Sequence, residues 1–494
     1  MPPFFFELTF SHGSTYHIQR IIRNAKGDSA MTTLDLPEKA MNDEQAIREE
    51  VVTASKTLSP SIALHPSLPW YSEVMMILNP RDAVERARDK KLLYNCLNLH
   101  GVPVAADRTA LLRQYVVPVF QTDVLAMYRS RNSYVWLANR NRRSRLPFHR
   151  VSASDKSKEV QRTGRLAIRA LYAMGLDYGV VKIGVQPGGQ LVVLDLIVEP
   201  KLNREMEDGF VRSIYLYGKQ LPHAVKPVEK VMLGADPEFI MQSKEGDLVL
   251  ASKFFPRYGR VGCDAIWYGS NRSDKPLVEL RPKPSTTPRN LVVQMMRGMI
   301  YAAKKVNDPS IRWLAGGMPY PGYPLGGHIH FSGVWLNFKL LRALDNYLTL
   351  PLMLAEDPRG VKRRPKYGYL GDFRPQFHGG FEYRTLPSWL ISPTLTKGVV
   401  ALAQLIAAKY PYLRYDFLQE YSVQKAYYQG DKEVIRDKLM EIWTDLSSLS
   451  EYGHFQEDLE GFFDWVFSGK TWDESVDFRP RWKLPPYHRK KASS

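Results

Sequence analysis

The stretch GADPEF, residues 234–239, lies within an apolar segment that predicts a strand over residues 231–240. Successive side chains of a strand point to opposite faces, so residues two apart share a face. Asp236 and Glu238 are therefore expected to project together. A buried carboxylate without a partner is costly, and a strand that serves only the core would not carry two of them. The stretch therefore indicates a polar site built on a β-sheet.

Three later segments repeat this pattern of polar side chains two residues apart. They are VELR at residues 278–281, GGHIHFS at residues 326–332 and FEYR at residues 381–384. The polar pairs that they contain are Glu279 with Arg281, His328 with His330, and Glu382 with Arg384. If the four strands share one sheet, carboxylates, imidazoles and guanidiniums gather on one face, and apolar neighbours such as Phe239 and Ile329 take the other.

The chemistry of this combination is specific. Carboxylates that lie close together repel each other unless cations hold them. Oxygen ligands together with an imidazole suit Mg²⁺ or Mn²⁺, and arginines grip phosphate and carboxylate groups with two parallel hydrogen bonds. Metal ligands and arginines on one sheet are typical of phosphoryl transfer, where catalysis depends on positioning and charge neutralisation.

Taken together and in this order, the four segments resemble those of the glutamine synthetase-like amidoligases, in particular the bacterial and phage carboxylate–amine ligases. The similarity covers about residues 230–390. It implies a catalytic domain with a curved, mainly antiparallel sheet and packing helices. It also implies an ATP-dependent ligase that joins a carboxylate to an amine through an acyl phosphate, on an amino acid, a peptide or an acidic polymer.

The resemblance further implies roles for individual residues, with ATP and two or more Mg²⁺ or Mn²⁺ ions as cofactors. Glu238 and Glu279 would hold one metal ion, and a second would lie on Asp236, His328 and Glu382. The residues expected to act in catalysis are Glu382, Arg384 and Glu238, with Arg384 facing the transferred phosphoryl group or the substrate carboxylate. The residues expected to bind the nucleotide are His330, Arg281, Arg374, Lys362 and Arg364. Glutamine synthetases generally have glutamate where this chain has Asp236, and the shorter side chain moves the metal or admits water.

Lys362 and Arg364 belong to the basic run at residues 362–366, which precedes Arg374 and Glu382 in the chain. A solvated loop is the alternative interpretation of this run. Cys263 suggests a nucleophile, but no third group completes such a site, and a small buried residue is the better interpretation. Asp264 is either a further ligand or a turn cap.

The first half of the chain is similar in outline to an ATP-grasp domain over residues 81–225. A helix over residues 158–174 is followed by two strands, residues 180–185 and 191–198, which Pro-Gly-Gly joins as a hairpin. Lys182 stands where that family has an acidic residue, Asp195 can replace the usual glutamate, and Ile197 occupies the expected asparagine position. An ammonium group there would repel Mg²⁺. We therefore expect a degenerate domain that binds a substrate or a peptide or protein partner.

These features predict an α+β fold with three parts: an N-terminal α/β segment over residues 1–80, the ATP-grasp-like module over 81–225, and the glutamine synthetase-like domain with C-terminal helices over 226–494. The two cysteines imply no disulfide framework, and no apolar run is long enough for a membrane helix. We therefore expect a cytoplasmic protein with no membrane contact. An oligomer is compatible with the sequence.

Two other functions are compatible with parts of the sequence. A metal-dependent amide hydrolase would use the same carboxylates and histidines without a nucleotide. A non-catalytic binder of acidic peptides or nucleic acid would rely on the net charge of +17 and on basic runs such as residues 140–145. Binding anions alone does not require the carboxylates, so nucleic acid is not the expected partner.

Overall fold

The computed structural model describes residues 6–10, 15–23, 29–37, 58–64, 71–105, 110–131 and 148–487. The basic run at residues 140–145 lies outside the described residues. The contacts divide the chain into two compact units, Met1–His223 and Ala224–Ser494. Helices and antiparallel sheets occur in both units, which confirms the α+β class.

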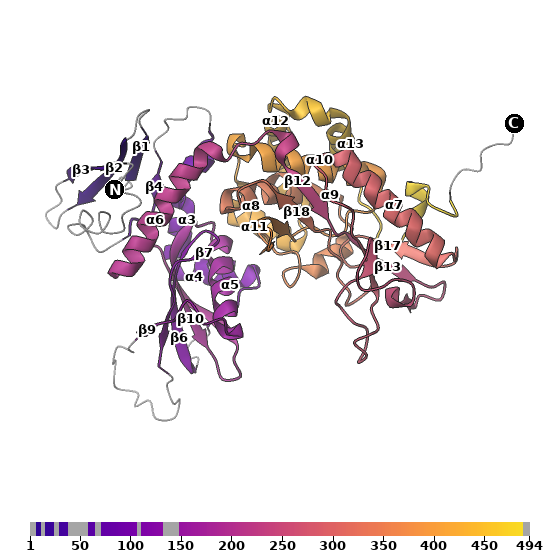
Figure 1. Cartoon of the computed structure of the whole chain (residues 1–494), viewed down its shortest axis with the longest axis horizontal. Coiled ribbons are helices and arrows are strands. Elements are labelled where there is room, and N and C mark those ends of the chain that lie inside the picture. The colour runs from indigo at the N-terminus through magenta and orange to yellow at the C-terminus, as the bar shows by residue number, and fades with distance from the viewer. Residues whose placement is uncertain are drawn as a thin grey trace. The chain divides into compact units, whose positions relative to one another are not determined.

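Unit 1 contains a three-stranded sheet, a pair of short strands and a six-stranded sheet with helices packed on it (Figure 1). Its strands are β1 (Phe6–Phe10), β2 (Thr15–Arg23), β3 (Ser29–Pro37), β4 (Ile62–Ala63), β5 (Ile77–Leu78), β6 (Arg113–Phe120), β7 (Asp123–Val124), β8 (Tyr128–Ser130), β9 (Phe148–Arg150), β10 (Tyr178–Val185) and β11 (Leu191–Ile197). Its helices are α2 (Glu73–Met76), α3 (Arg81–Arg88), α4 (Lys90–Leu99), α5 (Lys158–Ala173) and α6 (Arg204–Gln220).

The larger sheet of unit 1 has the order β11-β10-β6-β8-β9, with β7 paired to β6. Strands β10 and β11 form the hairpin that the sequence predicts, and α5 confirms the predicted helix. Ser157 caps α5 by accepting a hydrogen bond from the backbone N–H of Val160, which explains where the helix begins. Helix α5 packs on β6, β10 and β11 and so covers the centre of the sheet.

Unit 2 carries two sheets together with a layer of helices (Figure 1). Its strands are β12 (Met232–Ala235), β13 (Glu238–Gln242), β14 (Leu248–Val249), β15 (Val261–Cys263), β16 (Leu277–Leu280), β17 (Arg312–Leu314), β18 (Ile329–Ser332), β19 (Phe373–Pro375) and β20 (Phe381–Tyr383). Its helices are α7 (Pro288–Val306), α8 (Phe338–Leu344), the π-helical turn η6 (Asp345–Thr349), α9 (Leu350–Ala355), α10 (Pro393–Lys409), α11 (Tyr421–Gln429), α12 (Lys432–Ser447), α13 (Gln456–Phe467) and α14 (Arg479–Trp482).

Helix α10 forms the centre of the packing in unit 2. Nearly every residue from Leu395 to Lys409 is buried, because the helix is apolar on all sides and packs against α7, α8 and α13. Helix α7 in turn contacts β12, β15 and β16 and so links the helical layer to both sheets. The sheets therefore rest on a rigid support. Among the described residues, no helix combines the length and apolar character that a membrane crossing requires.

The strand predicted over residues 231–240 is in fact two strands in two different sheets, which corrects the expectation of a single sheet. Strand β12 lies at the edge of the sheet β12-β18-β20-β19, whereas β13 belongs to the sheet β14-β13-β16-β15, where β17 also pairs with it. The break falls at Asp236 and Pro237. Proline has no backbone N–H to donate to a neighbouring strand. A strand that pairs with neighbours on both sides is therefore interrupted at a proline.

Candidate active site

The first sheet of unit 2 aligns polar residues in a row across three of its four strands, with a glycine on the fourth. Gly234 of β12 is opposite His330 of β18, His330 is opposite Glu382 of β20, and Glu382 is opposite Arg374 of β19. Directly opposed residues of antiparallel strands project from the same face. A Cβ on Gly234 would lie 3.3 Å from that of His330, so the glycine leaves room for the imidazole.

The second sheet carries a shorter row. Glu238 of β13 is opposite Glu279 of β16, which is opposite Gly262 of β15. Arg281, two residues beyond Glu279, donates to its carboxylate through Nη2. A Cβ on Gly262 would meet Arg281 Nη1 at 2.0 Å, so the glycine makes the space in which this guanidinium lies.

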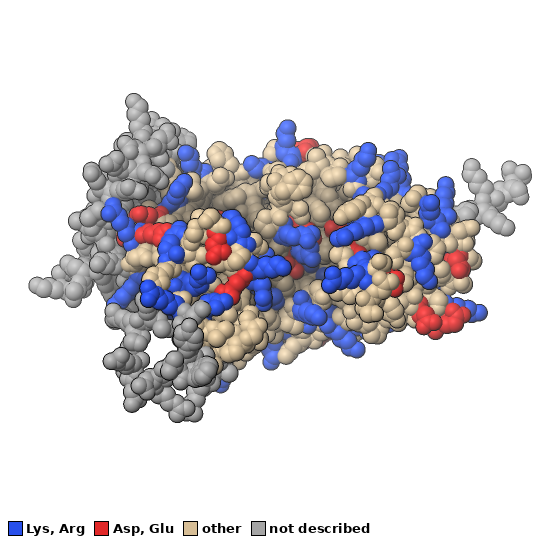
Figure 2. Space-filling model, turned by 60° about the horizontal axis from the view of Figure 1, so that its bottom comes forward, with Lys and Arg blue, Asp and Glu red and all other residues tan. Residues whose placement is uncertain are grey.

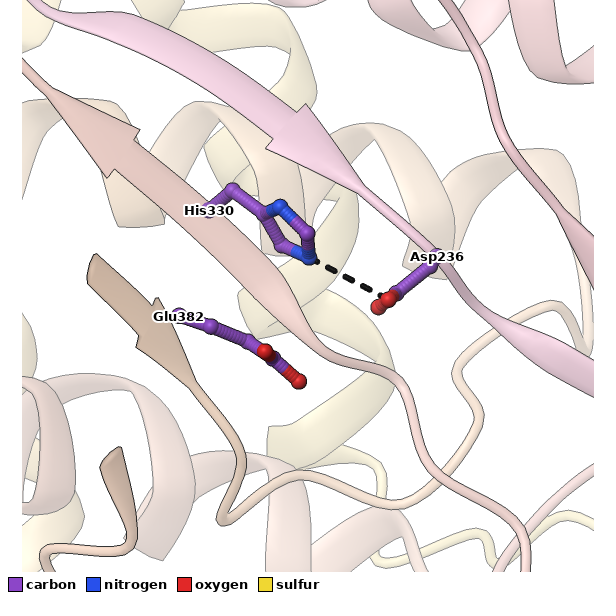
Figure 3. Close-up of side chains that lie close together, drawn as sticks. All are labelled: Asp236, His330 and Glu382. Atoms are coloured by element: carbon purple, nitrogen blue, oxygen red, sulfur yellow. Dashed lines mark ion pairs between the residues drawn. The ribbon is translucent and has the colours of Figure 1, made fainter. Parts of the chain in front are cut away.

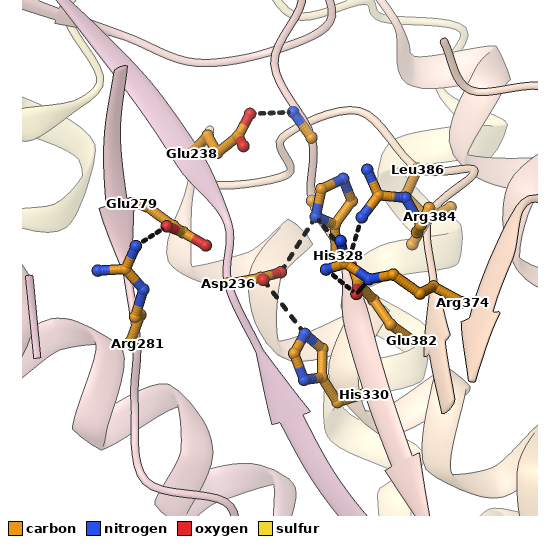
Figure 4. A network of polar contacts seen from close by, with 12 residues as sticks. Asp236, Glu238, Glu279, Arg281, His328, His330, Arg374, Glu382, Arg384 and Leu386 are labelled. Carbon is orange, nitrogen blue, oxygen red and sulfur yellow. Dashed lines mark hydrogen bonds and ion pairs between the residues drawn. The ribbon is translucent and has the colours of Figure 1, made fainter. Parts of the chain in front are cut away.

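The two rows meet at Asp236 and Pro237. The backbone N–H of Asp236 donates to His328 O at 3.2 Å, and that of Glu238 donates to Gly326 O at 2.9 Å. The chain thus stays hydrogen-bonded to the same neighbouring segment while it passes from one sheet to the other. Asp236 lies between the rows, with Glu238 and Glu279 on one side and the histidines and Glu382 on the other (Figure 4).

Asp236, His330 and Glu382 form a candidate metal site. Each offers one ligand atom, and these atoms all lie within 4.8 Å of one another. His330 Nε2 and Asp236 Oδ2 are 3.2 Å apart (Figure 3). His330 Nε2 and Asp236 Oδ1 are buried and have no hydrogen-bond partner of good geometry among the described residues. Two carboxylates and an imidazole with such unsatisfied atoms fit Mg²⁺ or Mn²⁺.

His328 lies beside the two carboxylates with which the sequence-based assignment grouped it. Its Nδ1 lies 3.2 Å from Asp236 Oδ1 and 3.2 Å from Glu382 Oε1, so the imidazole bridges the two carboxylates. The candidate ligand set contains His330, and the assignment of His328 as a ligand stays a prediction. A Cβ on Gly326 would meet His328 Nε2 at 2.3 Å, which explains why a glycine stands there.

Glu382 is the most enclosed member of the cluster, with a side chain that is 0% exposed. Arg384 Nη1 donates to its Oε1, and Arg374 Nε donates to its Oε2 at 2.7 Å. Gln376 Nε2 also donates to Oε2, at 3.0 Å. The sequence analysis missed Gln376, because its approach depends on the pairing of β19 with β20, which no local pattern encodes.

Burial and mutual repulsion control the protonation of the carboxylates. Burial, and then the charges of Asp264 and Glu279, raise the pKa of Glu238 well above its usual value. Burial and Asp236 raise the pKa of Glu279 to about 8. Burial also acts to raise the pKa of Asp236, but the imidazoles of His328 and His330 outweigh it and lower that pKa. Arg281 is thus not enough to offset burial and repulsion on the Glu238 side of the cluster, and a bound cation would supply further positive charge there.

Of the remaining residues expected to bind the nucleotide, one lies in the cluster and two do not contact it. Arg281 belongs to the cluster through Glu279. Arg364 is buried and pairs with Glu356, and its Nη1 donates to Tyr427 O at 2.9 Å, so its contacts are those of a core residue. Lys362 is exposed in the 3₁₀ helix η7 (Pro358–Arg363).

Two neighbouring residues have structural explanations. Cys263 is buried, and burial raises the pKa of its thiol, which suits a small core residue better than a nucleophile. Asp264 Oδ2 accepts a hydrogen bond from the backbone N–H of Ile266 at 3.0 Å, as a turn cap does. Asp264 is nevertheless close enough to Glu238 and Glu279 to raise the pKa of both.

The acidic positions of unit 1 are already neutralised. Lys182 and Asp195 are directly opposed on β10 and β11. Asp195 pairs with Lys90, and Glu199 pairs with Arg88 at 2.7 Å. These two carboxylates have cationic partners from the chain itself, and the expectation of a degenerate domain stays a prediction.

The part of the chain that carries this cluster matches a known protein family. The sequence model of the family described as "Phage phiEco32-like COOH.NH2 ligase-type 2" matches residues 233–484. The chain belongs to this family. The match begins at β12 and includes Asp236, Glu238, Glu279, His328, His330 and Glu382. No curated protein matches the chain in sequence.

Two solved structures show weak similarity in shape. One is a bifunctional glutathione synthetase from Pasteurella multocida, with a TM-score of 0.32, 11% identity and coverage of 51% of this chain and 49% of that one. The other is a multifunctional pyruvate carboxylase from Rhizobium etli, with a TM-score of 0.21, 14% identity and coverage of 53% of this chain and 24% of that one. This chain therefore spans about half the length of the synthetase that it matches.

Proposed function

We propose that this member of the carboxylate–amine ligase family is an ATP- and Mg²⁺-dependent enzyme that forms an amide or peptide bond through an acyl phosphate. The observation that carries the proposal is the convergence of Asp236, His330 and Glu382, whose ligand atoms lie within 4.8 Å of one another. Glu238 and Glu279 are directly opposed in the adjoining sheet and would hold a second ion. A glutamine synthetase-like catalytic domain is part of this proposal.

In the first step, a carboxylate oxygen of the substrate attacks the γ-phosphorus of ATP. The bond between this phosphorus and the bridging oxygen to the β-phosphate breaks, so that ADP leaves and an acyl phosphate forms. Divalent cations bound to the cluster would offset the negative charge of the phosphate oxygens. Arg384 and Arg374 flank Glu382 and present guanidinium groups at the same place, where they can grip phosphate or carboxylate oxygens.

In the second step, the amine nitrogen of the other substrate attacks the acyl carbon. Inorganic phosphate leaves with the bonding electrons and takes up the proton that the nitrogen loses, which gives the amide. His328 holds Asp236 and Glu382 in register through its contacts at 3.2 Å, so it keeps the site assembled during both steps. Mostly buried carboxylates and imidazoles also limit access of water, which would otherwise hydrolyse the acyl phosphate.

The substrates are expected to be anionic. The chain carries a net charge of +17, and on the face shown in Figure 2 the blue Lys and Arg side chains cover visibly more surface than the red Asp and Glu side chains. Such a field raises the local concentration of anions. An amino acid, a peptide or an acidic polymer with a free carboxylate is compatible with this charge.

The proposal is tested by incubating the protein with Mg²⁺-ATP and pooled amino acids and peptides. The expected result is ADP together with a product whose mass equals the sum of two substrates minus water. Glu382→Ala and His328→Ala should abolish ADP formation and keep the fold, whereas Cys263→Ala should retain it. Normal ADP release by the Glu382 variant would refute the assignment. Cleavage of amides in ATP-free buffer would instead indicate a hydrolase, and anion binding that survives loss of Glu238 and Glu382 would indicate a non-catalytic binder.

A further inference from the structure

The carboxylate of Glu382 is fully engaged by the chain itself. Arg384 donates to Oε1, while Arg374 and Gln376 donate to Oε2. Yet Glu382 also belongs to the candidate metal set. Each carboxylate oxygen has two lone pairs, and with the contact of His328 Nδ1 to Oε1 at 3.2 Å all four have a partner. A cation that binds Glu382 must therefore displace one of these partners, and the two guanidiniums are the ones whose charge opposes it.

The two arginines are held with different strength. Arg384 is 27% exposed, and its Nε also lies 4.0 Å from a carboxylate oxygen of Asp372. Arg374 is 58% exposed, and among the described residues Glu382 provides the ion pair that the structure records for it. An exposed side chain with one carboxylate partner loses little when it leaves, because water solvates the free guanidinium. Arg374 is therefore the group that a cation displaces.

We propose that Arg374 is an anion-binding residue stored on Glu382, and that a divalent cation releases it to bind the terminal phosphate of the nucleotide. This inference rests on the proposed function, because it requires that phosphate meets a cation at Glu382. A cation on Glu382 supplies the positive charge that Arg374 supplies in its absence, and it repels the guanidinium. The freed guanidinium remains on the strand β19 directly opposite Glu382, where it can grip a phosphate group with two hydrogen bonds.

The consequence is cooperative binding of cation and nucleotide. A phosphate that captures the released Arg374 prevents the arginine from returning to Glu382, so the nucleotide strengthens cation binding. By linkage, the cation strengthens nucleotide binding by the same factor.

The experiment measures the binding of Mn²⁺ alone, by electron paramagnetic resonance, and of a non-hydrolysable β,γ-imido analogue of ATP with Mn²⁺, by calorimetry. In Arg374→Ala the competing charge is absent, so Mn²⁺ alone should bind about fivefold or more tightly than in the wild type, while the analogue should bind about tenfold or more weakly. A purely structural role for Arg374 would weaken both. Arg374→Lys should bind Mn²⁺ nearly as the wild type does and should bind the analogue more weakly, because lysine retains the charge and loses the two-pronged grip.

Arg436→Ala is the matched control, because it removes an arginine from a surface ion pair with Glu433 in the same unit. It should leave both affinities unchanged within about twofold. Mn²⁺ binding that is unchanged or weaker in Arg374→Ala would overturn the inference, while ADP formation by the wild type would leave the ligase function standing. Tighter Mn²⁺ binding in Arg374→Ala with unchanged binding of the analogue would overturn the phosphate-binding role of Arg374, and no binding of the analogue by the wild type would overturn the ligase function and this inference with it.

Discussion

Glu238 and Glu279 lie directly opposite each other on β13 and β16, and both are buried. Among the described residues, the Glu238 carboxylate accepts a hydrogen bond from the backbone N–H of Gly326, at 2.7 Å from Oε2. Arg281 pairs with Glu279 and not with Glu238. The pair therefore stores repulsion in the metal-free protein, as sites that bind cations commonly do.

We predict that Glu238→Gln stabilises the metal-free protein and abolishes turnover. The amide keeps an oxygen for the Gly326 N–H and removes the cost of ionising Glu238, or of keeping it protonated, beside other carboxylates. A gain of about 1 kcal/mol would raise the melting temperature by about 2–4 °C for a unit of this size. Calorimetry in the presence of a chelator measures the shift, and a lower melting temperature would contradict the stored repulsion.

Glu356→Gln makes the same chemical change but should lower the stability. Glu356 is buried against the guanidinium of Arg364, so the substitution leaves a buried positive charge without its partner. Breaking a buried ion pair in this way costs about 3–5 kcal/mol. We expect a clear fall in melting temperature, which separates repulsion at Glu238 from a general effect of replacing buried glutamates.

The local chemistry of the site was predictable from the sequence, whereas its three-dimensional assembly was not. Polar residues at a spacing of two identified Asp236 and Glu382, because that spacing is a local property of a strand. The pairing of Glu238 with Glu279 depends on contacts between distant segments, which no local pattern encodes. Pro237 did carry a signal, since proline is disfavoured within a paired strand, and it marks the point where the expected strand passes into a second sheet.

Gly326 should be required for the position of the His328 ring. A methyl group there would lie 2.3 Å from His328 Nε2, so Gly326→Ala must push the imidazole away from Asp236 and Glu382. We expect Mg²⁺-ATP turnover to fall by about a hundredfold or more, as misplacement near 1 Å does. Gly453→Ala is the control, because no atom lies within 4 Å of its added methyl group. Equal turnover in the two variants would contradict a positioning role for His328.

Unit 1 should contribute no second metal-dependent ATP site. Asp195 and Glu199 are paired with Lys90 and Arg88, so they are not available to a cation without breaking those pairs. We predict that the double variant Asp195→Asn, Glu199→Gln retains ADP formation within about twofold of the wild type, in line with the small value of exposed ion pairs. Steady-state assays at saturating Mg²⁺-ATP make the comparison. A loss as large as that of Glu382→Ala would show that unit 1 has an active site of its own.

Glu474 should make the stability of unit 2 depend on pH. Its carboxylate is buried and accepts hydrogen bonds from the backbone N–H groups of Gly317 and Met318. Burial, which outweighs these two hydrogen bonds, raises the pKa of Glu474 to about 7, from 4.5. Between these values the folded protein keeps a proton that the unfolded chain has released. The resulting stabilisation is fully present below about pH 4.5 and is lost as the pH rises through 7.

Glu474→Gln removes this titration, so the difference in unfolding free energy between wild type and variant isolates it. As the pH rises from 4.5 to about 7.5, we expect the wild type to lose about 3 kcal/mol of unfolding free energy relative to the variant. This follows because each unit of pKa shift corresponds to about 1.4 kcal/mol. Urea unfolding at closely spaced pH values measures it, and Glu433→Gln, at an exposed site, reports the effect of losing a solvated carboxyl over the same range. A difference that stays constant, or that grows in favour of the wild type at high pH, would mean that the two backbone hydrogen bonds outweigh burial and keep Glu474 ionised.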